Sequence, residues 1–285
     1  MVFLMTGMIF VLACVALLVL AFHSYTPHWP RRPVGRIAVL VSSCLEFHES
    51  TLPVVLGSLS KTKVPQEDVF VVIGDAPEFS DGYCTYYTID ASADASAETS
   101  SYVVRVLYVP FTSFDHNALM WMVYTQSPEL QPYSWVFQIH DTTAFVPSFH
   151  ESLTDVLEDH VWHAPNLAAL RLSSGFSMSM GYYRKTALYQ HKDAILDQTL
   201  NWDTNPETRV HHKGMHIEDG VFKLLQSKGE VIRSITGPDA SKTEYNVPSP
   251  YAQSGSAFRR RQLWERPGLY KYQANYGQAP WHVNL

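Results

Sequence analysis

Polar and acidic side chains are grouped at four points along the sequence, and three of the groups follow an apolar run typical of a buried strand. In chain order, the groups contain Ser42 and Glu49, then Asp75, then His140, Asp141 and Thr143, and finally Glu218 and Asp219. Open α/β sheets bind their ligands beyond the carboxyl ends of their strands. The spacing therefore predicts a ligand site at one edge of a sheet.

Two of these groups also have a plain structural interpretation. Asp and Thr are common where a strand stops at a turn, which would account for Asp141 and Thr143. Asp219 would serve as the N-cap of a helix beginning at residue 220, and the helix dipole favours Glu218 beside it. Taken alone, these residues leave both interpretations open.

The apolar runs predict an α/β fold. Residues 36–43 (RIAVLVSS) and 68–73 (DVFVVI) are continuous and rich in β-branched side chains, as in strands buried on both faces. A helical pattern lies between them, and this order indicates a parallel sheet with a right-handed crossover. The expected fold is a mostly parallel sheet flanked by helices. Strands are expected at 36–43, 68–73, 102–109, 135–139 and 168–172, helices at 52–59, 117–125, 148–160, 185–200 and 220–228, and a loop at 91–101.

The first residues predict a membrane anchor. Residues 2–22 are apolar apart from Thr6 and carry no charge. About 20 such residues suffice to cross a bilayer, whereas a signal peptide has an apolar core of about 7–15 residues behind a basic leader. We expect a single-pass signal-anchor at 1–22, a stalk at 23–35 and one domain at 36–285, irregular over 240–285.

Two arguments predict opposite orientations for this anchor. Arg31, Arg32 and Arg36 follow the apolar segment. The positive-inside rule would keep that side cytoplasmic. The function considered below implies the opposite, a type II protein of the endoplasmic reticulum or Golgi membrane.

Composition excludes one class of partner. The 285 residues carry a formal charge of −6, with a pI near 6.1, so no broad basic field is available to neutralise nucleic-acid phosphates. Cys14 belongs to the anchor, and Cys44 and Cys84 leave one possible internal pair. One pair does not fix the redox compartment.

Three histidines open a second catalytic hypothesis. His212 and His216 are four residues apart, with His211 adjacent, as in zinc sites on a helix. The HExxH motif of zinc hydrolases is missing, and Gly214 falls inside the span. The serine nucleophile elbow and the glycine fingerprints of dinucleotide and P-loop sites are missing as well.

Seven segments occur in a recognisable order between about residues 36 and 235. They are IAVLVSS, FHESTLPVVLGSL, VPQEDVFVVIGDAP, SFDHNALMWMV, WVFQIHDTTAFVPSFHESLTDVL, SSGFSMSMGYYRKTAL and MHIEDGVFKLLQSKGEVI. In this order the chain resembles the GT-A class of nucleotide-sugar-dependent glycosyltransferases. It is most similar to the large inverting family typified by cellulose and hyaluronan synthases.

The resemblance implies an inverting transferase that moves a sugar from a nucleotide-sugar donor to a glycan, lipid or protein hydroxyl. Asp219 would be the general base, with Glu218 beside it. A divalent cation, Mn²⁺ or Mg²⁺, would neutralise the departing diphosphate and would be held by Asp141, Thr143 and His282. The donor would contact Ser42, Glu49, Asp75, Asp115, Asn117 and His140.

One motif departs from the family pattern. The Asp-x-Asp element is His140-Asp141-Thr142-Thr143 here, with a single carboxylate. If Asp141 aligns with the first acid, Thr143 replaces the second, and if Asp141 aligns with the middle position, both acids are replaced. This departure weakens the expected metal site. The alternative is therefore a catalytically inactive, membrane-tethered protein that binds nucleotide sugars on the same fold.

Overall fold

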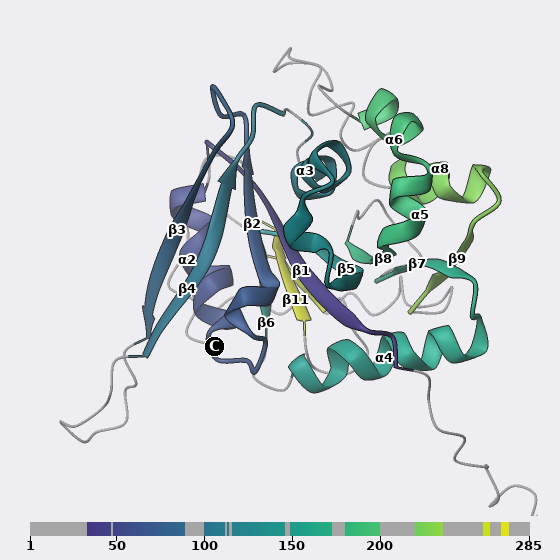
Figure 1. Cartoon of the computed structure of the whole chain (residues 1–285). Helices are drawn as coiled ribbons and strands as arrows, with labels where there is room; N and C mark the ends of the chain where they lie inside the picture. The colour runs from purple at the N-terminus through teal and green to yellow at the C-terminus, as the bar shows by residue number, and fades with distance from the viewer. Residues whose placement is uncertain are drawn as a thin grey trace, which may run out of the picture. The chain divides into compact units, whose positions relative to one another are not determined.

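A mixed eight-stranded sheet forms the centre of the fold (Figure 1). The computed structural model describes residues 33–46, 48–88, 100–111, 113, 116–145, 149–172, 180–199, 220–235, 259–262 and 269–273. The strands of the large sheet are β1 (Arg36–Cys44), β2 (Val69–Gly74), β3 (Ser80–Thr88), β4 (Ser100–Tyr108), β5 (Tyr133–His140), β7 (Leu167–Arg171), β8 (Gly181–Arg184) and β9 (Val231–Ser234).

The strands of this sheet follow the order β3-β4-β2-β1-β5-β8-β7-β9. β1 pairs in parallel with both β2 and β5, β2 with β4, and β7 with β9. Only β3 and β8 run against their neighbours. All strands except these two therefore point the same way, and their carboxyl ends lie along one edge, called the carboxyl edge below.

A small second sheet consists of β10 (Arg259–Gln262), β11 (Leu269–Gln273) and β6 (Thr143–Phe145). β11 pairs antiparallel with both β10 and β6. Since β6 begins three residues after β5 ends, this sheet brings a distant part of the chain next to the end of β5.

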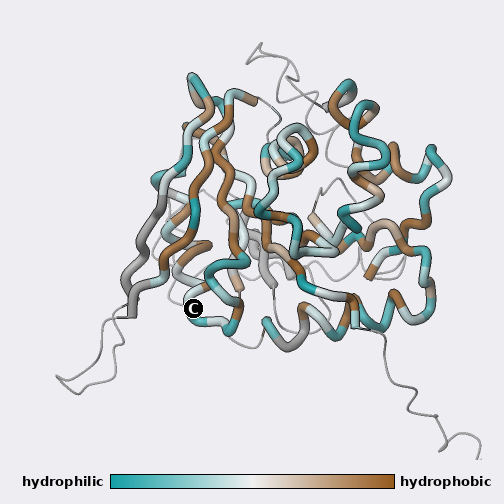
Figure 2. The backbone as a smooth tube through the Cα atoms, viewed as in Figure 1, coloured by the Kyte–Doolittle hydropathy of each residue, from teal (hydrophilic) through white to brown (hydrophobic). Residues whose placement is uncertain are grey.

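Helices cover both faces of the large sheet. One face packs against α2 (His48–Leu59) and α4 (Phe149–His163). The other packs against α3 (Asn117–Thr125), α5 (Lys185–Gln190), α6 (Lys192–Thr199) and α8 (Gly220–Ser227). Figure 2 shows hydrophobic residues concentrated along the central strands between these layers. Burying one Val, Leu or Ile side chain stabilises a fold by about 1.5–3 kcal/mol, so this core explains why β1 and β2 are apolar on both faces.

The α/β prediction is confirmed, with differences in detail. The helix expected at 52–59 begins one turn earlier, at His48, because its polar first turn adds nothing to the apolar pattern. The helix expected at 185–200 is divided at His191 into α5 and α6. β3, β6, β8 and β9 were not predicted, nor were β10 and β11, which lie in the segment expected to be irregular.

The predicted membrane anchor at 2–22 lies outside the described residues, as do residues 23–32 of the stalk predicted at 23–35. Within the described ranges, no helix has the length and apolar character required to span a bilayer.

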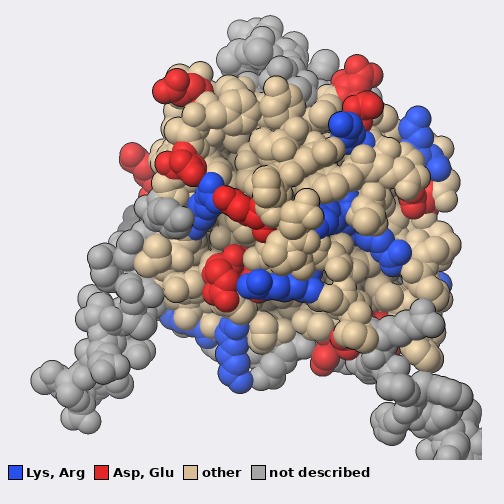
Figure 3. Space-filling model, in the orientation of Figure 1, with Lys and Arg blue, Asp and Glu red and all other residues tan. Residues whose placement is uncertain are grey.

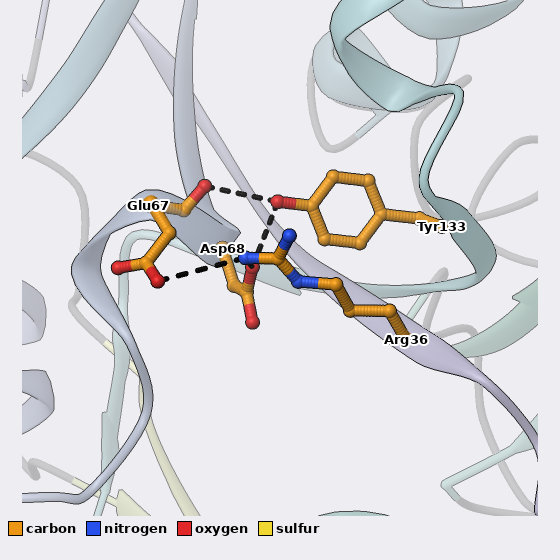
Figure 4. Close-up of polar contacts among 4 residues, drawn as sticks. All are labelled: Arg36, Glu67, Asp68 and Tyr133. Carbon is orange, nitrogen blue, oxygen red and sulfur yellow. Dashed lines mark hydrogen bonds and ion pairs between the residues drawn. The ribbon is translucent and has the colours of Figure 1, made fainter.

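Opposite the carboxyl edge, a polar network joins the beginnings of β1 and β5 to the short 3-10 helix η1 (Gln66–Asp68) (Figure 4). The buried carboxylate of Asp68 accepts hydrogen bonds from Tyr133 Oη at 2.7 Å and from Arg36 Nη2 at 2.6 Å. The Arg36 guanidinium also lies 5.0 Å from the centre of the Tyr133 ring. Burial, followed by the bond to Asp68, raises the pKa of Tyr133. Asp68 is therefore the hydrogen-bond acceptor that Tyr133 and Arg36 share at this edge.

Replacing Asp68 with Ala removes that acceptor and leaves Tyr133 and Arg36 without their shortest contacts. We expect a loss of about 2–3 kcal/mol in the free energy of unfolding, measured by urea titration. Glu67→Ala is the matched control. The Glu67 side chain is 65% exposed and its carboxylate lies 3.6 Å from Arg36, so we expect a change below about 0.5 kcal/mol. Equal effects of the two substitutions would contradict the assignment of Asp68 as the common acceptor.

Opposite charges also pair around Arg105. Arg105 in β4 pairs with Asp81 in β3 at 2.7 Å and with Glu129 in the 3-10 helix η3 (Pro128–Leu130). Figure 3 shows basic and acidic side chains next to one another across this view of the surface.

Candidate functional site

The topology of the sheet defines where a ligand would bind. From β1 the chain continues through β2 to β4 on one side, and then returns to β5 on the other side of β1. A crevice opens between neighbouring strands whose connections leave in opposite directions, and ligands of open α/β sheets bind there. In this chain that position lies beyond Cys44 and His140, the last residues of β1 and β5.

Asp141 stands directly beyond β5 and is held by two hydroxyl groups. Its Oδ2 accepts hydrogen bonds from Ser43 Oγ at 2.5 Å and from Thr51 Oγ1 at 2.6 Å. Its backbone N–H donates to the Ser42 carbonyl at 3.0 Å. Hydrogen bonds to an ionised acceptor are shorter and stronger than neutral ones. The carboxylate therefore fastens the end of β5 to β1 and to the first turns of α2.

Asn117 joins three segments at the same edge. This fully buried side chain donates from Nδ2 to the Ser43 carbonyl at 3.0 Å and accepts at Oδ1 from the Ser113 N–H at 2.9 Å. The amide lies against Gly74, the last residue of β2. The predicted site residue Asn117 thus positions the ends of β1 and β2 relative to the start of α3.

Ser42 is also engaged within the fold. Its hydroxyl oxygen accepts hydrogen bonds from the Ala118 N–H at 3.0 Å and from Gln138 Nε2 at 2.6 Å. The residue is 2% exposed. Its observed contacts attach β1 to α3 and β5, beneath the surface of the site.

Asp75 occupies the turn after β2 in an unusual backbone conformation. Its φ is +63°, in the left-handed region that Asp enters more readily than most residues. Its N–H donates to the Phe111 carbonyl at 2.8 Å, and its side chain is partly exposed. Non-glycine residues in this conformation are concentrated at functional sites. Asp75 is therefore well placed to contact a ligand at the carboxyl edge.

The other predicted residues divide into three groups. Glu49 is exposed in the first turn of α2, which follows β1 at the carboxyl edge. His140 and Thr143 are buried, and the Thr143 hydroxyl lies 3.6 Å from the sulfur of Met180. Outside the described residues are Asp115, Glu218, Asp219 and His282, as well as the histidines of the zinc hypothesis, His211, His212 and His216.

The start of α8 can nevertheless be located. β9 is parallel to β7, and α8 leads into β9 through a short turn at Gly229, whose φ of +84° is the left-handed conformation that commonly ends a helix. A helix that precedes a parallel strand begins near the carboxyl edge. Gly220, the first residue of α8, therefore belongs to the same edge as Asp141.

The described donors do not fit a divalent cation. Across these ranges, no group of three or more His, Cys, Asp or Glu side chains could hold a metal ion. Mg²⁺ and Mn²⁺ favour several oxygen ligands. Asp141 contributes one carboxylate whose Oδ2 already accepts two hydroxyl hydrogen bonds, and Thr143 is fully buried beside Met180. The described part of the expected metal site therefore supplies one acidic ligand.

Two residues that fasten the site were absent from the predicted set: Thr51 and Gln138. Thr51 lies in the helix directly after β1, and the first turns of such a helix face the carboxyl edge, which was the available signal. Gln138 interrupts an otherwise apolar strand and donates to Ser42.

The site and sheet together define an α/β protein with polar side chains at the carboxyl ends of β1 and β5. No protein-family model matches the chain. No curated protein matches it either.

Comparison with solved structures gives distant similarities. Two are structures of TarS from S. aureus, with 11% and 13% identity, TM-scores of 0.32 and 0.33, and 55% of this chain covered in each case. A third is the mannosyltransferase PcManGT from Pyrobaculum calidifontis in complex with GDP-Man and Mn²⁺, with 11% identity, a TM-score of 0.33 and 58% of this chain covered.

The matched part spans 49% and 29% of the two TarS chains and 50% of the mannosyltransferase. Similarity at this level assigns neither a family nor an activity, so the proposals below rest on the residues of this chain.

The packing of Asn117 against Gly74 can be tested with one methyl group. A Cβ at Gly74 would overlap the Asn117 amide, whereas a Cβ at Gly82 in β3 would meet no atom within 4 Å. We expect Gly74→Ala to displace Asn117, break its two hydrogen bonds and lower the free energy of unfolding by about 2–4 kcal/mol. Gly82→Ala should change it by less than about 0.5 kcal/mol. Thermal and urea unfolding measure both, and a stable Gly74→Ala protein would show that the Asn117 contacts are dispensable.

Proposed function

We propose that the chain is a nucleotide-sugar-dependent glycosyltransferase with a GT-A-like fold. The observation that carries the proposal is the arrangement of Asp75, Asn117 and Asp141 around the carboxyl ends of β2, β1 and β5, where the strand order of the sheet reverses. The ordered sequence resemblance points to the same class. Fold alone does not determine activity, so these residues at this edge are the argument.

The proposed reaction exchanges two bonds at the anomeric carbon of the donor sugar. The acceptor hydroxyl oxygen forms a bond to that carbon as the bond to the diphosphate oxygen breaks, and the diphosphate leaves with the electron pair. Asp219 takes the acceptor proton as general base, with Glu218 beside it. Attack opposite the leaving group inverts the anomeric configuration. The start of α8 at the carboxyl edge supports this assignment, since Asp219 directly precedes Gly220.

Asp75 and Glu49 are proposed to contact the nucleoside part of the donor. Asp75 lies in the turn after β2, and Glu49 is exposed in the first turn of α2. Both carboxylates can accept hydrogen bonds from ribose hydroxyls or base N–H groups. Ser42, Asn117 and Asp141 then hold the strands that present these side chains.

One observation favours a second candidate, a nucleotide-sugar-binding protein without transferase activity. The single described carboxylate of the Asp-x-Asp element is fastened by Ser43 and Thr51. This arrangement keeps a rigid crevice even if catalytic groups are missing. The two candidates differ in turnover and agree in donor binding.

We also propose that residues 2–22 anchor the chain in an endomembrane as a single-pass type II protein, which would place the domain on the lumenal side. The support is the uncharged apolar run itself. Glycosylation of a sequon inserted in an exposed loop, such as the Lys61–Lys63 turn, would report a lumenal domain. If the inserted sequon is not glycosylated in cells, the result would indicate that the domain faces the cytoplasm.

Nucleotide release by the full chain in detergent tests the proposed activity. UDP-, GDP- and CMP-sugars would be offered with a glycan and lipid acceptor mixture. We expect donor-selective release that falls about 100-fold or more in Asp219→Asn, the loss typical of removing a general base. Asp155→Asn, an exposed change on α4, is the matched control and should retain wild-type rates.

Binding by the same proteins separates the two candidates. Tight, selective binding of a donor without release would support the binding protein. Failure to bind any nucleotide sugar or nucleotide would contradict both candidates.

A further inference from the structure

We propose that Arg171 binds the diphosphate of the donor and supplies positive charge near Asp141, where the described residues offer one acidic metal ligand. The inference rests on the proposed nucleotide-sugar function and names the residue that recognises the anionic part of the donor. A departing nucleoside diphosphate concentrates negative charge, which either a metal ion or a fixed guanidinium can stabilise.

Arg171 is placed at the required edge. It is the last residue of β7. The last residues of the other parallel strands β1, β2, β4, β5 and β9 are Cys44, Gly74, Tyr108, His140 and Ser234. Among these described strand ends, Arg171 is therefore the one permanent cation.

The register places Arg171 close to the crevice. Gly181 in β8 is paired with Gln138 in β5 on one side and with Arg171 in β7 on the other. Neighbouring strands lie about 4.8 Å apart, so the backbones of Arg171 and Gln138 are about 10 Å apart. Gln138 is the residue that donates to Ser42. A long side chain at Arg171 thus begins two strands from the end of β5.

The orientation of the guanidinium is set by packing. The tip of the Phe222 ring lies next to Gly181, because a Cβ at Gly181 would lie 3.1 Å from Phe222 Cζ. The Arg171 guanidinium lies 5.2 Å from the centre of that ring. Phe222 also stacks on Tyr183, with ring centres 4.7 Å apart. A rigid aromatic pair thus supports the guanidinium.

This support is compatible with anion binding. Stacking uses the flat face of a guanidinium, whereas its N–H donors point outward in the plane of the group. The planar fork suits two oxygens of a phosphate at once. The Asp141 carboxylate already accepts two hydroxyl hydrogen bonds, and the described residues offer few metal ligands. Both observations favour a guanidinium as the group that neutralises the diphosphate.

Arg184 provides a matched control for the test. It lies in the neighbouring strand β8 and stacks on an aromatic ring in the same way, with its guanidinium 5.0 Å from the centre of Trp135. It occupies the opposite end of the sheet, since β8 is antiparallel to β5 and β7. Arg171→Gln and Arg184→Gln each remove one cation–aromatic contact, but only the first removes a cation from the carboxyl edge.

The experiment compares affinities of the full chain for UDP, GDP and ADP with those for uridine, guanosine and adenosine, by calorimetry with EDTA present. For the base that binds, we expect wild type and Arg184→Gln to prefer the diphosphate over the nucleoside in EDTA. Arg171→Gln should lose about 10-fold or more of that preference while its nucleoside affinity stays unchanged. Arg171→Lys should recover part of it, because a point charge replaces the fork.

Two results would overturn the role of Arg171 without contradicting the nucleotide-sugar function. One is an unchanged diphosphate preference in Arg171→Gln, and the other is a wild-type preference that EDTA abolishes and Mn²⁺ restores. If the wild type binds neither nucleosides nor diphosphates, the nucleotide-sugar function fails and the inference falls with it. Matching thermal midpoints for the two Gln variants would confirm that a loss of binding is local to Arg171.

Discussion

The carboxyl edge depends on one buried carboxamide, that of Asn117. It donates to the Ser43 carbonyl, accepts from the Ser113 N–H and fills the space that a side chain at Gly74 would require. A buried polar group is costly unless it is hydrogen-bonded, so these contacts act together to fix α3 against β1 and β2. Asp75 follows Gly74 directly, and Asp141 is held by the hydroxyl of Ser43, whose carbonyl accepts from Asn117.

The two edges of the sheet use polar groups differently. At the amino edge, Asp68 is buried between Tyr133 and Arg36, and the three groups satisfy one another. At the carboxyl edge, Asp75 and Asp141 are partly exposed while the groups behind them are buried. The first arrangement stabilises the fold, and the second presents carboxylates on a rigid support. A site of this kind needs such a supporting layer to keep its geometry.

The sequence was sufficient to predict the elements with strong apolar patterns. β1, β2, β5, α3 and α8 lie where their periodicity indicated, because burial on one or both faces leaves a clear signal. Short or polar strands such as β8 and β10 give no such signal, since their position depends on pairing with partners distant in the chain. The same limit applies within the site: Asp75 and Asp141 were evident from their position after strands, whereas the role of Arg171 becomes evident only through contacts across the fold.

The central claim is that a nucleotide binds at the carboxyl ends of β1 and β5. Hydrogen–deuterium exchange of the full chain, with and without the nucleotide that binds best, tests it most directly. The account predicts slower exchange in the segments after β1, β2 and β5, at residues 44–52, 74–76 and 140–143, with no change at the amino edge around Asp68 and Tyr133. Protection confined to the amino edge, or none at saturating nucleotide, would contradict it.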